Sequence, residues 1–198
     1  MLHILILCLL AYCIGSLSSA ILICRLMGLP DPRTTGSKNP GATNVLRTGN
    51  KKAAIATLLG DAAKGAVPVL IAVQIDPAPA CVGPVMVASV LGHIYPLFFK
   101  FKGGKGVATA LGAIFALCWA VGALLLLTWG MVVFFFRISS LAALITALLA
   151  PFYTAWLLNN AFAMAVSIIS LLLFWRHREN IKRLWQGVEP KIGRKTNL

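Results

Sequence analysis

Several apolar runs, each about as long as a bilayer crossing, constrain the fold of this 198-residue chain more than any other feature. A transmembrane helix needs roughly 20 apolar residues. The chain is 59% hydrophobic and only 12% charged, whereas soluble domains carry about 25% charged residues. The pattern therefore predicts an all-α integral membrane protein. The candidate spans are Leu2–Cys24, Ala53–Ile75, Cys81–Phe99, Val107–Phe136, Leu141–Leu158 and Ala161–Trp175.

The basic residues predict how these runs are oriented. The 18 Lys and Arg residues outnumber the 5 Asp and Glu residues, and they lie between the first two runs, after the third, after the fourth and in the tail. The connectors Asp76–Ala80 and Asn159–Asn160 contain no Lys or Arg. The positive-inside rule therefore predicts that all the basic segments are cytoplasmic. Nucleic acid is not implied, because topology, anionic lipid and an anionic substrate explain charge placed between apolar runs.

The run Val107–Phe136 is longer than one straight span needs, and it is flanked by basic residues at both ends. It must then cross an even number of times, which predicts two short helices with a turn near Trp119–Gly122. The total becomes seven transmembrane helices, with the N-terminus periplasmic and the C-terminus cytoplasmic. The alternative is one long tilted helix, which would put Arg137 on the opposite side.

The ends of the chain are interpreted as part of one membrane-embedded domain, residues 1–198. Leu2–Ala20 ends on small residues as a signal peptide does, but it lacks a basic beginning and its apolar run continues past Ala20. We therefore expect a retained helix. No internal repeat appears, and a polar cytoplasmic tail begins at about Arg176.

Cysteines and acids give no sign of a metal or cofactor in the sequence. The cysteines lie in or at the ends of apolar runs without a CxxC pair, as expected of thiols packed as small hydrophobes. The acids are scattered and form no cluster of the kind that holds magnesium. We expect no metal and no cofactor. The residues are Cys8, Cys13, Cys24, Cys81 and Cys118, and Asp31, Asp61, Asp76, Glu179 and Glu189.

The first basic connector contains a glycine-rich stretch that runs from Gly36 to Arg47 and offers groups suited to phosphate. Asn39 begins an Asn-Pro-Gly turn signal. Thr43 and Asn44 are predicted to cap a short helix, with the planar Arg47 guanidinium about one turn further on. The same pattern also fits an ordinary polar loop whose basic residues only set topology.

The second glycine-rich stretch, Lys102-Gly103-Gly104-Lys105-Gly106, leads directly into the run that begins at Val107. A glycine loop that opens a helix favours an anion, because unpaired N–H groups and the helix dipole point at it. The spacing is not that of a Walker A loop, so ATP is not implied. The alternative is a flexible basic linker.

Titratable residues within or near the ends of the spans have either a functional or a structural role. Asp61 and Lys64 lie i,i+3 within one span, so we expect them to pair and to face the bundle. His93, near the end of the third span, is open to either interpretation.

The last span meets the tail at a third basic stretch. His177 and Asn180 are i,i+3 and share a face if the helix continues, while Arg176 and Arg178 are expected to reach lipid headgroups. Ser139 and Ser140 are interpreted as a helix N-cap.

Three stretches together resemble a known family, the bacterial acylphosphate-dependent glycerol-3-phosphate acyltransferases (PlsY). GSKNPGATNVLR, GHIYPLFFKFKGGKGVATALG and RHRENIKRL occur in that family's order, and the match covers nearly the whole chain. The resemblance implies a seven-helix enzyme of the bacterial inner membrane with its active site facing the cytoplasm. It implies transfer of a fatty acyl group from acyl phosphate to the 1-hydroxyl of glycerol 3-phosphate. The products are lysophosphatidate and inorganic phosphate, the first acylation step of phospholipid synthesis.

The resemblance also implies site residues and partners. Lys105 and the glycine amides are expected to hold acyl phosphate, while Arg47, His177 and Asn180 hold glycerol 3-phosphate. Either His177 or a substrate phosphate accepts the hydroxyl proton. Partners are these two substrates, membrane lipid and, transiently, the enzyme that makes acyl phosphate. The expected catalytic residues are Ser37, Arg47, Lys105, Ser140, His177 and Asn180, and the expected phosphate-binding residues are Asn39, Thr43, Asn44, Gly103, Gly104 and Gly106.

One position departs from the family pattern, because Lys38 stands where the family more commonly has glycine, which leaves the conformation of that turn open. Two other classes of protein compete with the enzyme. A transporter for an anionic metabolite could use the same cationic loops as a gate, but it should show repeats and broken helices. The chain could also be a purely structural membrane subunit, but that interpretation does not explain the two glycine-rich cationic loops.

Overall fold

The computed structural model describes residues 1–192, and this part of the chain is helical with no β-strand. The helices follow the apolar runs, and polar or glycine-containing connectors of different lengths separate them. In chain order the elements are α1 (Leu2–Gly15), α2 (Ser19–Leu26), α3 (Ala42–Arg47), α4 (Lys51–Ile75), α5 (Pro79–Ile94), the 3-10 turn η1 (Leu97–Phe99), α6 (Val107–Leu117), α7 (Trp119–Phe136), α8 (Ser139–Leu157), α9 (Asn160–Arg176) and α10 (Arg178–Trp185).

Helix lengths confirm an all-helical membrane protein. Among residues 1–192, 5 helical segments are long and apolar enough to cross a bilayer, with α1 and α2 taken together as one of them. The number rises to 6 if α9 and α10, which meet at a bend of 60°, form one span. The shorter α6 is apolar but falls below that length. The count of seven crossings and the orientation of the termini stay predictions.

The long run Val107–Phe136 is interrupted, as the charge pattern predicted. Cys118 has an extended backbone (φ −152°, ψ 109°) that separates α6 from α7, and the two helices pack against each other. The break lies one residue before the predicted turn region. The alternative of one long tilted helix is therefore wrong.

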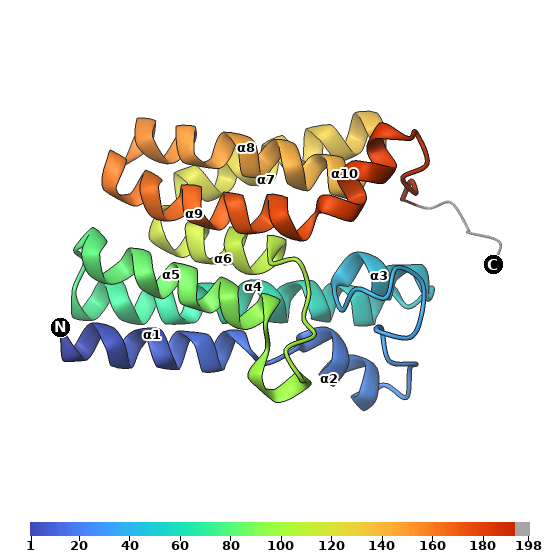
Figure 1. The fold of residues 1–198 in the computed structure, drawn as a ribbon, viewed down its shortest axis with the longest axis horizontal. Coiled ribbons are helices and arrows are strands. Elements are labelled where there is room, and N and C mark those ends of the chain that lie inside the picture. The colour runs from blue at the N-terminus through green and yellow to red at the C-terminus, as the bar shows by residue number, and fades with distance from the viewer. Residues whose placement is uncertain (193–198) are drawn as a thin grey trace.

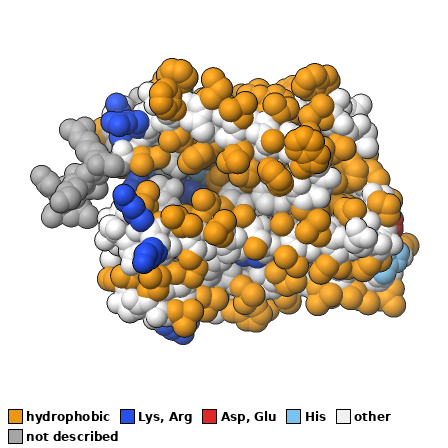
Figure 2. Space-filling view, turned by 180° about the vertical axis from the view of Figure 1, so that it is seen from behind, with side chains coloured by type: hydrophobic (Ala, Val, Ile, Leu, Met, Phe, Trp, Pro, Cys, Tyr) orange, Lys and Arg blue, Asp and Glu red, His pale blue; other side chains and the backbone are white. Residues whose placement is uncertain are grey.

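The two ends of the bundle differ in what they carry (Figure 1). One end holds the start of α1, the α4–α5 turn and the α8–α9 turn, and we call it the far end. The opposite end holds α2, α3, the α7–α8 turn and α10, and we call it the basic end. Hydrophobic side chains cover most of the face in Figure 2, while Lys and Arg gather at the basic end.

Small residues let the helices around the site pack closely. α5 is central, and its Val85, Met86 and Val90 side chains are fully buried. Where α4 crosses α6, a Cβ atom on Gly65 would overlap the carbonyl oxygen of Thr109, and one on Gly112 would overlap that of Ala62. Backbones in such contact gain the van der Waals packing that holds helices together in lipid. The crossing fixes α6 and, with it, the loop that precedes it.

Candidate functional site

A cavity of about 580 Å³ at the basic end brings the three basic stretches together. Its walls come from α3, α4, α6, the start of α8 and the α9–α10 junction. The sequence-predicted residues that line it are Ser37, Asn39, Thr43, Asn44, Arg47, Lys105, Gly106, Ser140, His177 and Asn180. Gly103 and Gly104, which were also predicted, are not part of its lining.

The buried Asn44 side chain shapes the first glycine-rich stretch from within. Its Oδ1 accepts a hydrogen bond from the Ser37 backbone N–H (2.9 Å), and its Nδ2 donates to the carbonyl oxygens of Pro32 (2.7 Å) and Thr35 (3.1 Å). α3 has Gly41 as its N-cap and no side-chain cap. The prediction that Thr43 and Asn44 cap this helix is therefore wrong, since both lie inside it.

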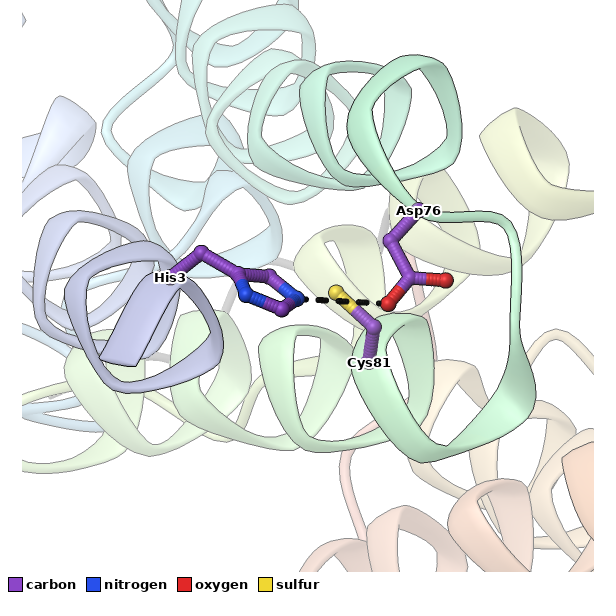
Figure 3. A group of neighbouring side chains, drawn as sticks. All are labelled: His3, Asp76 and Cys81. Carbon is purple, nitrogen blue, oxygen red and sulfur yellow. Dashed lines mark hydrogen bonds and ion pairs between the residues drawn. The ribbon is translucent and has the colours of Figure 1, made fainter. Parts of the chain in front are cut away.

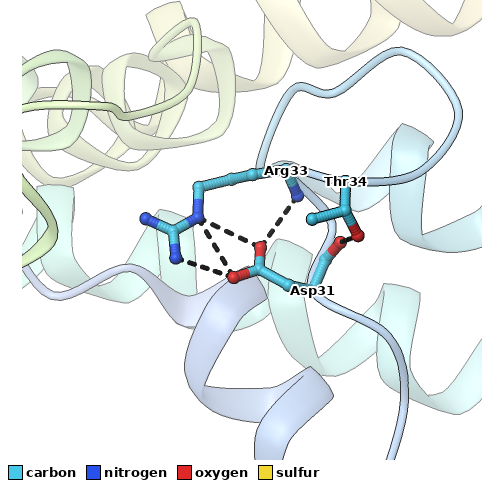
Figure 4. A network of polar contacts seen from close by, with 3 residues as sticks. All are labelled: Asp31, Arg33 and Thr34. Atoms are coloured by element: carbon cyan, nitrogen blue, oxygen red, sulfur yellow. Dashed lines mark hydrogen bonds and ion pairs between the residues drawn. The ribbon is translucent and has the colours of Figure 1, made fainter.

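A second polar contact fixes the beginning of the same connector (Figure 4). Arg33 donates from its backbone N–H and its guanidinium to the Asp31 carboxylate, with a shortest distance of 2.7 Å. The Thr34 hydroxyl donates to the Asp31 carbonyl oxygen at 2.9 Å. The hydrogen bond from the Arg33 side chain lowers the pKa of Asp31. Because both side chains are about a third exposed, the ion pair orders the loop but contributes little to the free energy of folding.

Lys38 adopts the backbone conformation in which glycine is usual. Its φ is 57°, in the left-handed region that costs an L-residue roughly 1–2 kcal/mol. The turn therefore takes a conformation that suits glycine, although a larger side chain occupies the position. The strain is stored beside the cavity, two residues after Gly36.

The glycines of the second stretch are required by close packing. A Cβ atom on Gly103 would overlap the His93 carbonyl oxygen, and one on Gly104 would overlap His93 Nε2. The Gly104 N–H donates to the His93 carbonyl oxygen at 3.2 Å. That amide is thus committed to α5, which corrects the expectation that it holds an anion. Gly106, with φ 86°, then opens α6 at Val107, as the sequence predicted, and aims the positive end of a helix dipole at the cavity.

Arg176 holds the loop from the other side. Its guanidinium donates to the carbonyl oxygens of Gly104 (3.2 Å) and Gly103 (3.3 Å) and lies 5.9 Å from the centre of the Tyr95 ring. The prediction that Arg176 reaches lipid headgroups is therefore wrong. Arg178 is exposed and lies over the Trp175 ring.

Lys105 points into the cavity as a poorly solvated cation. Its Nζ donates a short hydrogen bond to Asn180 Oδ1, which joins the loop to α10. Burial lowers the pKa of Lys105 to about 8, with help from Arg183 and Arg47, although Glu189 raises it. A partly desolvated ammonium interacts strongly with a phosphate that reaches it.

Glu189 is the main residue that the sequence analysis missed. Its carboxylate accepts hydrogen bonds from Ser140 Oγ (2.7 Å), from Arg183 Nε (2.6 Å) and from Asn180 Nδ2. Only 5% of this side chain is exposed. Burial raises the pKa of Glu189, but the three hydrogen bonds and the charge of Arg183 together outweigh burial, so the pKa is lowered. The one available signal was that Glu189 is the last acidic residue and follows the third basic stretch.

Two further predictions about local helix structure change at this wall of the cavity. α9 ends at Arg176 and α10 begins after a bend, so His177 and Asn180 do not share one continuous helix, although both line the cavity. α8 begins at Ser139 with Ile138 as its N-cap. The N-cap interpretation of Ser139 and Ser140 is therefore wrong, since both lie in the first turn.

The tautomer of the buried His177 follows from its hydrogen bond. Its Nδ1 lies 2.7 Å from the Leu173 carbonyl oxygen, and a carbonyl can only accept. Nδ1 therefore carries the proton, and in the neutral ring Nε2 keeps its lone pair. A neutral His177 can accept a proton through Nε2.

A buried polar cluster lies at the inner wall of the cavity. Lys64 Nζ is 2.8 Å from Asp61 Oδ1, which confirms the predicted pair, and it also donates to the Leu17 carbonyl oxygen at 2.7 Å. His93 Nδ1 lies 3.6 Å from the same Asp61 oxygen, a contact that the sequence did not predict. Asp61 and His93 line the cavity. The cluster joins α4, α5 and the α1–α2 junction behind the glycine loop.

The sequence was compared with models of protein families and with known proteins. The family model described as "Glycerol-3-phosphate acyltransferase" matches residues 5–187. A glycerol-3-phosphate acyltransferase of Vibrio cholerae is 55% identical over 185 residues, 93% of this chain and 88% of the relative. One of Methylococcus capsulatus is 53% identical over 186 residues, 93% of this chain and 94% of the relative.

Solved structures give the same result for the fold. The crystal structure of PlsY (YgiH), an integral membrane glycerol 3-phosphate acyltransferase in its glycerol 3-phosphate form, superposes with a TM-score of 0.92 at 39% identity. Its lysophosphatidic acid form gives 0.90 at 38% identity. Each comparison covers 96% of both chains.

Proposed function

This chain belongs to the glycerol-3-phosphate acyltransferase family, and we propose that it transfers a fatty acyl group from acyl phosphate to the 1-hydroxyl of glycerol 3-phosphate. The products are lysophosphatidate and inorganic phosphate, and the reaction is the first acylation step of phospholipid synthesis. The two solved structures of the related PlsY are described as its glycerol 3-phosphate form and its lysophosphatidic acid form. These are one substrate and the product of the proposed reaction, which supports it.

The observation that carries the proposal is the meeting of cationic and apolar walls in one cavity. Lys105, Arg47 and Arg183 line it together with Leu111 and Trp129. Phosphate needs the first group of residues, and a fatty acyl chain needs the second. Acyl phosphate carries both a phosphate and a fatty acyl chain, so it suits this cavity. Lysophosphatidate suits it too, because it keeps the acyl chain and carries the phosphate of glycerol 3-phosphate.

The donors around Glu189 support the location of an anion site. Hydroxyl, amide and guanidinium groups converge on its carboxylate, so this wall already stabilises one negative charge. We propose that Lys105 and the start of α6 bind the acyl phosphate, and that Arg47 and Ser37 bind glycerol 3-phosphate from the first stretch. Asn180 and Ser140 act mainly by positioning, since their side chains contact Lys105 and Glu189.

The proposed chemistry is direct transfer. The 1-hydroxyl oxygen of glycerol 3-phosphate attacks the carbonyl carbon of the acyl phosphate, and the bond from that carbon to the phosphate oxygen breaks. Phosphate leaves with the electron pair, and the hydroxyl proton goes to His177 Nε2 or to a substrate phosphate. Cationic groups already in place stabilise the developing charge. No cysteine lines the cavity in the described part of the chain, which favours direct attack over a thioester.

We extend the proposal to topology and location. The basic end faces the cytoplasm because basic connectors resist translocation, and the site opens on that side of the bacterial inner membrane. Seven crossings follow if α6 and α7 each count as one. Acyl phosphate is amphiphilic, so transient contact with the enzyme that makes it would shorten the transfer. The chain acts as one domain, residues 1–198, of which residues 193–198 lie outside the described part.

A direct assay tests the reaction. Purified protein in lipid nanodiscs, given palmitoyl phosphate and radiolabelled glycerol 3-phosphate, is expected to form lysophosphatidate without any partner protein. Acyl-CoA is the matched alternative donor and should give much less product. Product from acyl-CoA alone would overturn the donor assignment. Uptake of labelled glycerol 3-phosphate into proteoliposomes without product would favour a transporter, and neither activity would favour a structural subunit.

The proton acceptor has its own test. If His177 Nε2 accepts the proton, His177→Gln should lower kcat by about 10²–10⁴-fold, the usual range for a general base. A kcat within about threefold of wild type would assign the proton to a substrate phosphate instead. KM for glycerol 3-phosphate, measured in the same series, separates lost binding from lost proton transfer.

A further inference from the structure

Three potential metal ligands meet at the far end of the bundle, away from the cavity. His3 lies in the first turn of α1, Asp76 directly follows α4, and Cys81 lies in the first turns of α5. One ligand atom from each lies within 4.8 Å of the other two (Figure 3). We propose that these side chains form a binding site for a zinc-class divalent ion. The sequence predicted none, because the ligands are far apart along the chain.

The separation between His3 and Asp76 suits tetrahedral coordination. His3 Nε2 and Asp76 Oδ2 are 3.3 Å apart. Two ligand atoms at Zn–N and Zn–O distances of about 2.0–2.1 Å and a tetrahedral angle are about 3.3 Å apart. The same separation is long for a strong charged hydrogen bond, which is shorter than about 3 Å. An ion between the two groups therefore requires little movement of either.

The other carboxylate oxygen of Asp76 is already occupied, and this orients the group. Asp76 Oδ1 accepts a hydrogen bond from the Ala78 N–H at 3.1 Å in the turn between α4 and α5. That contact leaves Oδ2 directed at His3. Second contacts of this kind hold a ligand in position and strengthen metal affinity.

The donor set selects the ion. Imidazole nitrogen, thiolate sulfur and carboxylate oxygen together are typical of zinc, whereas magnesium and calcium take oxygen ligands. A thiolate and a carboxylate also neutralise a divalent cation, which suits a position at the edge of a membrane. Three protein ligands leave a fourth position for water. His3 and Asp76 are 49% and 33% exposed, so an ion can enter from solvent although Cys81 is buried.

Bound metal would tie the start of α1 to the junction of α4 and α5. α1 packs against α4 and α5, and the His3–Asp76 contact already joins the start of α1 to the end of α4. An ion that binds the folded state stabilises it in proportion to its free concentration. The cavity lies toward the other end of the same helices, so the acyltransfer reaction should not require the ion.

Cobalt(II) is the probe, because its thiolate complex absorbs in the near ultraviolet and its tetrahedral complex in the visible. Full-length protein, purified with chelator and reductant and placed in nanodiscs, is titrated with Co²⁺ and then with Zn²⁺. We expect one Co²⁺ per chain with a thiolate band, displacement by Zn²⁺, and a rise in Tm with Zn²⁺. Mg²⁺ at the same concentration should do none of these.

Variants separate this site from unspecific binding. Cys81→Ser should abolish the thiolate band, and His3→Gln and Asp76→Asn, at exposed or half-exposed positions, should each weaken Co²⁺ binding by about tenfold or more. Cys13→Ser is the matched control, a half-buried thiol of α1, and should bind as wild type does. A thiolate band that persists in Cys81→Ser, or its absence from folded wild-type protein, would overturn the proposal.

Discussion

The two ends of the bundle are built differently, although the same helices reach both. At the far end, α4 and α5 and then α8 and α9 are joined by short turns, and Asn159 caps α9 by accepting from the Phe162 N–H. At the basic end the α2–α3 and α5–α6 connectors are long, and several connectors contain residues in strained backbone conformations. Every residue with positive φ in the described part, whether glycine or not, lies in the basic-end connectors or in the segment after α10. The non-glycine ones are Lys38, Lys100, Phe101 and Arg137.

The difference indicates that the far end serves mainly the stability of the fold, whereas the basic end holds the candidate site. Sparsely populated backbone conformations persist only where surrounding contacts impose them, and they cluster at functional sites. Here the contacts are the Asn44 hydrogen bonds, the Arg176 clamp and the Glu189 network. The far end lacks positive-φ residues among residues 1–192, and its role is to keep the helices together. Substitutions at the two ends should therefore have different consequences.

The largest expected effect is the loss of activity in Lys105→Ala. Removing this half-buried cation, which we propose binds the transferring phosphate, should lower kcat/KM by about 10²–10³-fold, as removal of one preorganised donor does in other enzymes. Lys102→Ala, an exposed lysine of the same loop, is the matched control and should stay within about twofold. The measurement is the rate of lysophosphatidate formation over a range of acyl phosphate concentrations.

A far-end variant completes this comparison. Asn159→Ala removes a helix cap, so it should lower stability by about 1 kcal/mol and leave kcat/KM unchanged. Equal activity losses in Lys105→Ala and Asn159→Ala would show that the two ends are not functionally distinct. Thermal unfolding of all three variants in the same detergent separates instability from lost chemistry.

The next effect is on pH dependence and concerns the basic end alone. The pKa of Lys105 is lowered to about 8, so the ammonium is present below that pH and lost above it. Activity should fall by about tenfold per pH unit once pH rises past that pKa. Lys105→Arg keeps its charge and should remove the fall, whatever its absolute rate.

Glu189→Gln sharpens the same experiment. The Glu189 carboxylate raises the pKa of Lys105, so its neutral isostere should move the fall in activity to lower pH. A profile that does not shift in Glu189→Gln would contradict the assignment of the fall to Lys105. Glu179→Gln, an exposed acid on α10, is the control and should not shift the profile.

The smallest effect should be a gain. Lys38→Gly relieves a left-handed residue, so it should stabilise the protein by at most about 1 kcal/mol, because the greater freedom of glycine in the unfolded chain offsets part of the relief. Lys38→Ala keeps the strain and should give no gain. The measurement is Tm in a matched pair. A loss of stability in Lys38→Gly would mean that the lysine side chain contributes more than its backbone costs.

Hydropathy and charge were sufficient to predict the bundle because lipid demands long apolar helices and basic residues resist translocation. The same reasoning located the break in Val107–Phe136 and the Asp61–Lys64 pair. The glycine-rich basic stretches and the family resemblance supplied the predicted site residues, which all line one cavity except Gly103 and Gly104. Those two glycines illustrate the limit, since one sequence cannot reveal that their missing Cβ atoms make room for His93.

Other features depended on tertiary contacts that no local pattern encodes. Arg176 looked like a headgroup anchor, but the loop lies within its reach because α9 ends there. Glu189 joins Ser140 and Asn180 across a large sequence separation. The capping predictions for Thr43 and Ser139 placed helix starts one or two residues too late. These errors arise because α3 and α8 begin without a side-chain cap, so polar residues do not mark where the two helices start.

The shortness of α6 has a consequence for how an amphiphile reaches the site. An 11-residue helix is about 16 Å long, roughly half the thickness of the hydrocarbon layer, and in Figure 1 it starts well inside the basic end marked by α3 and α10. The glycine loop is therefore recessed below the rim of the bundle. A lipid-like reactant can sink its head into this hollow while its tail stays at bilayer depth, so neither loading nor release requires desorption into water.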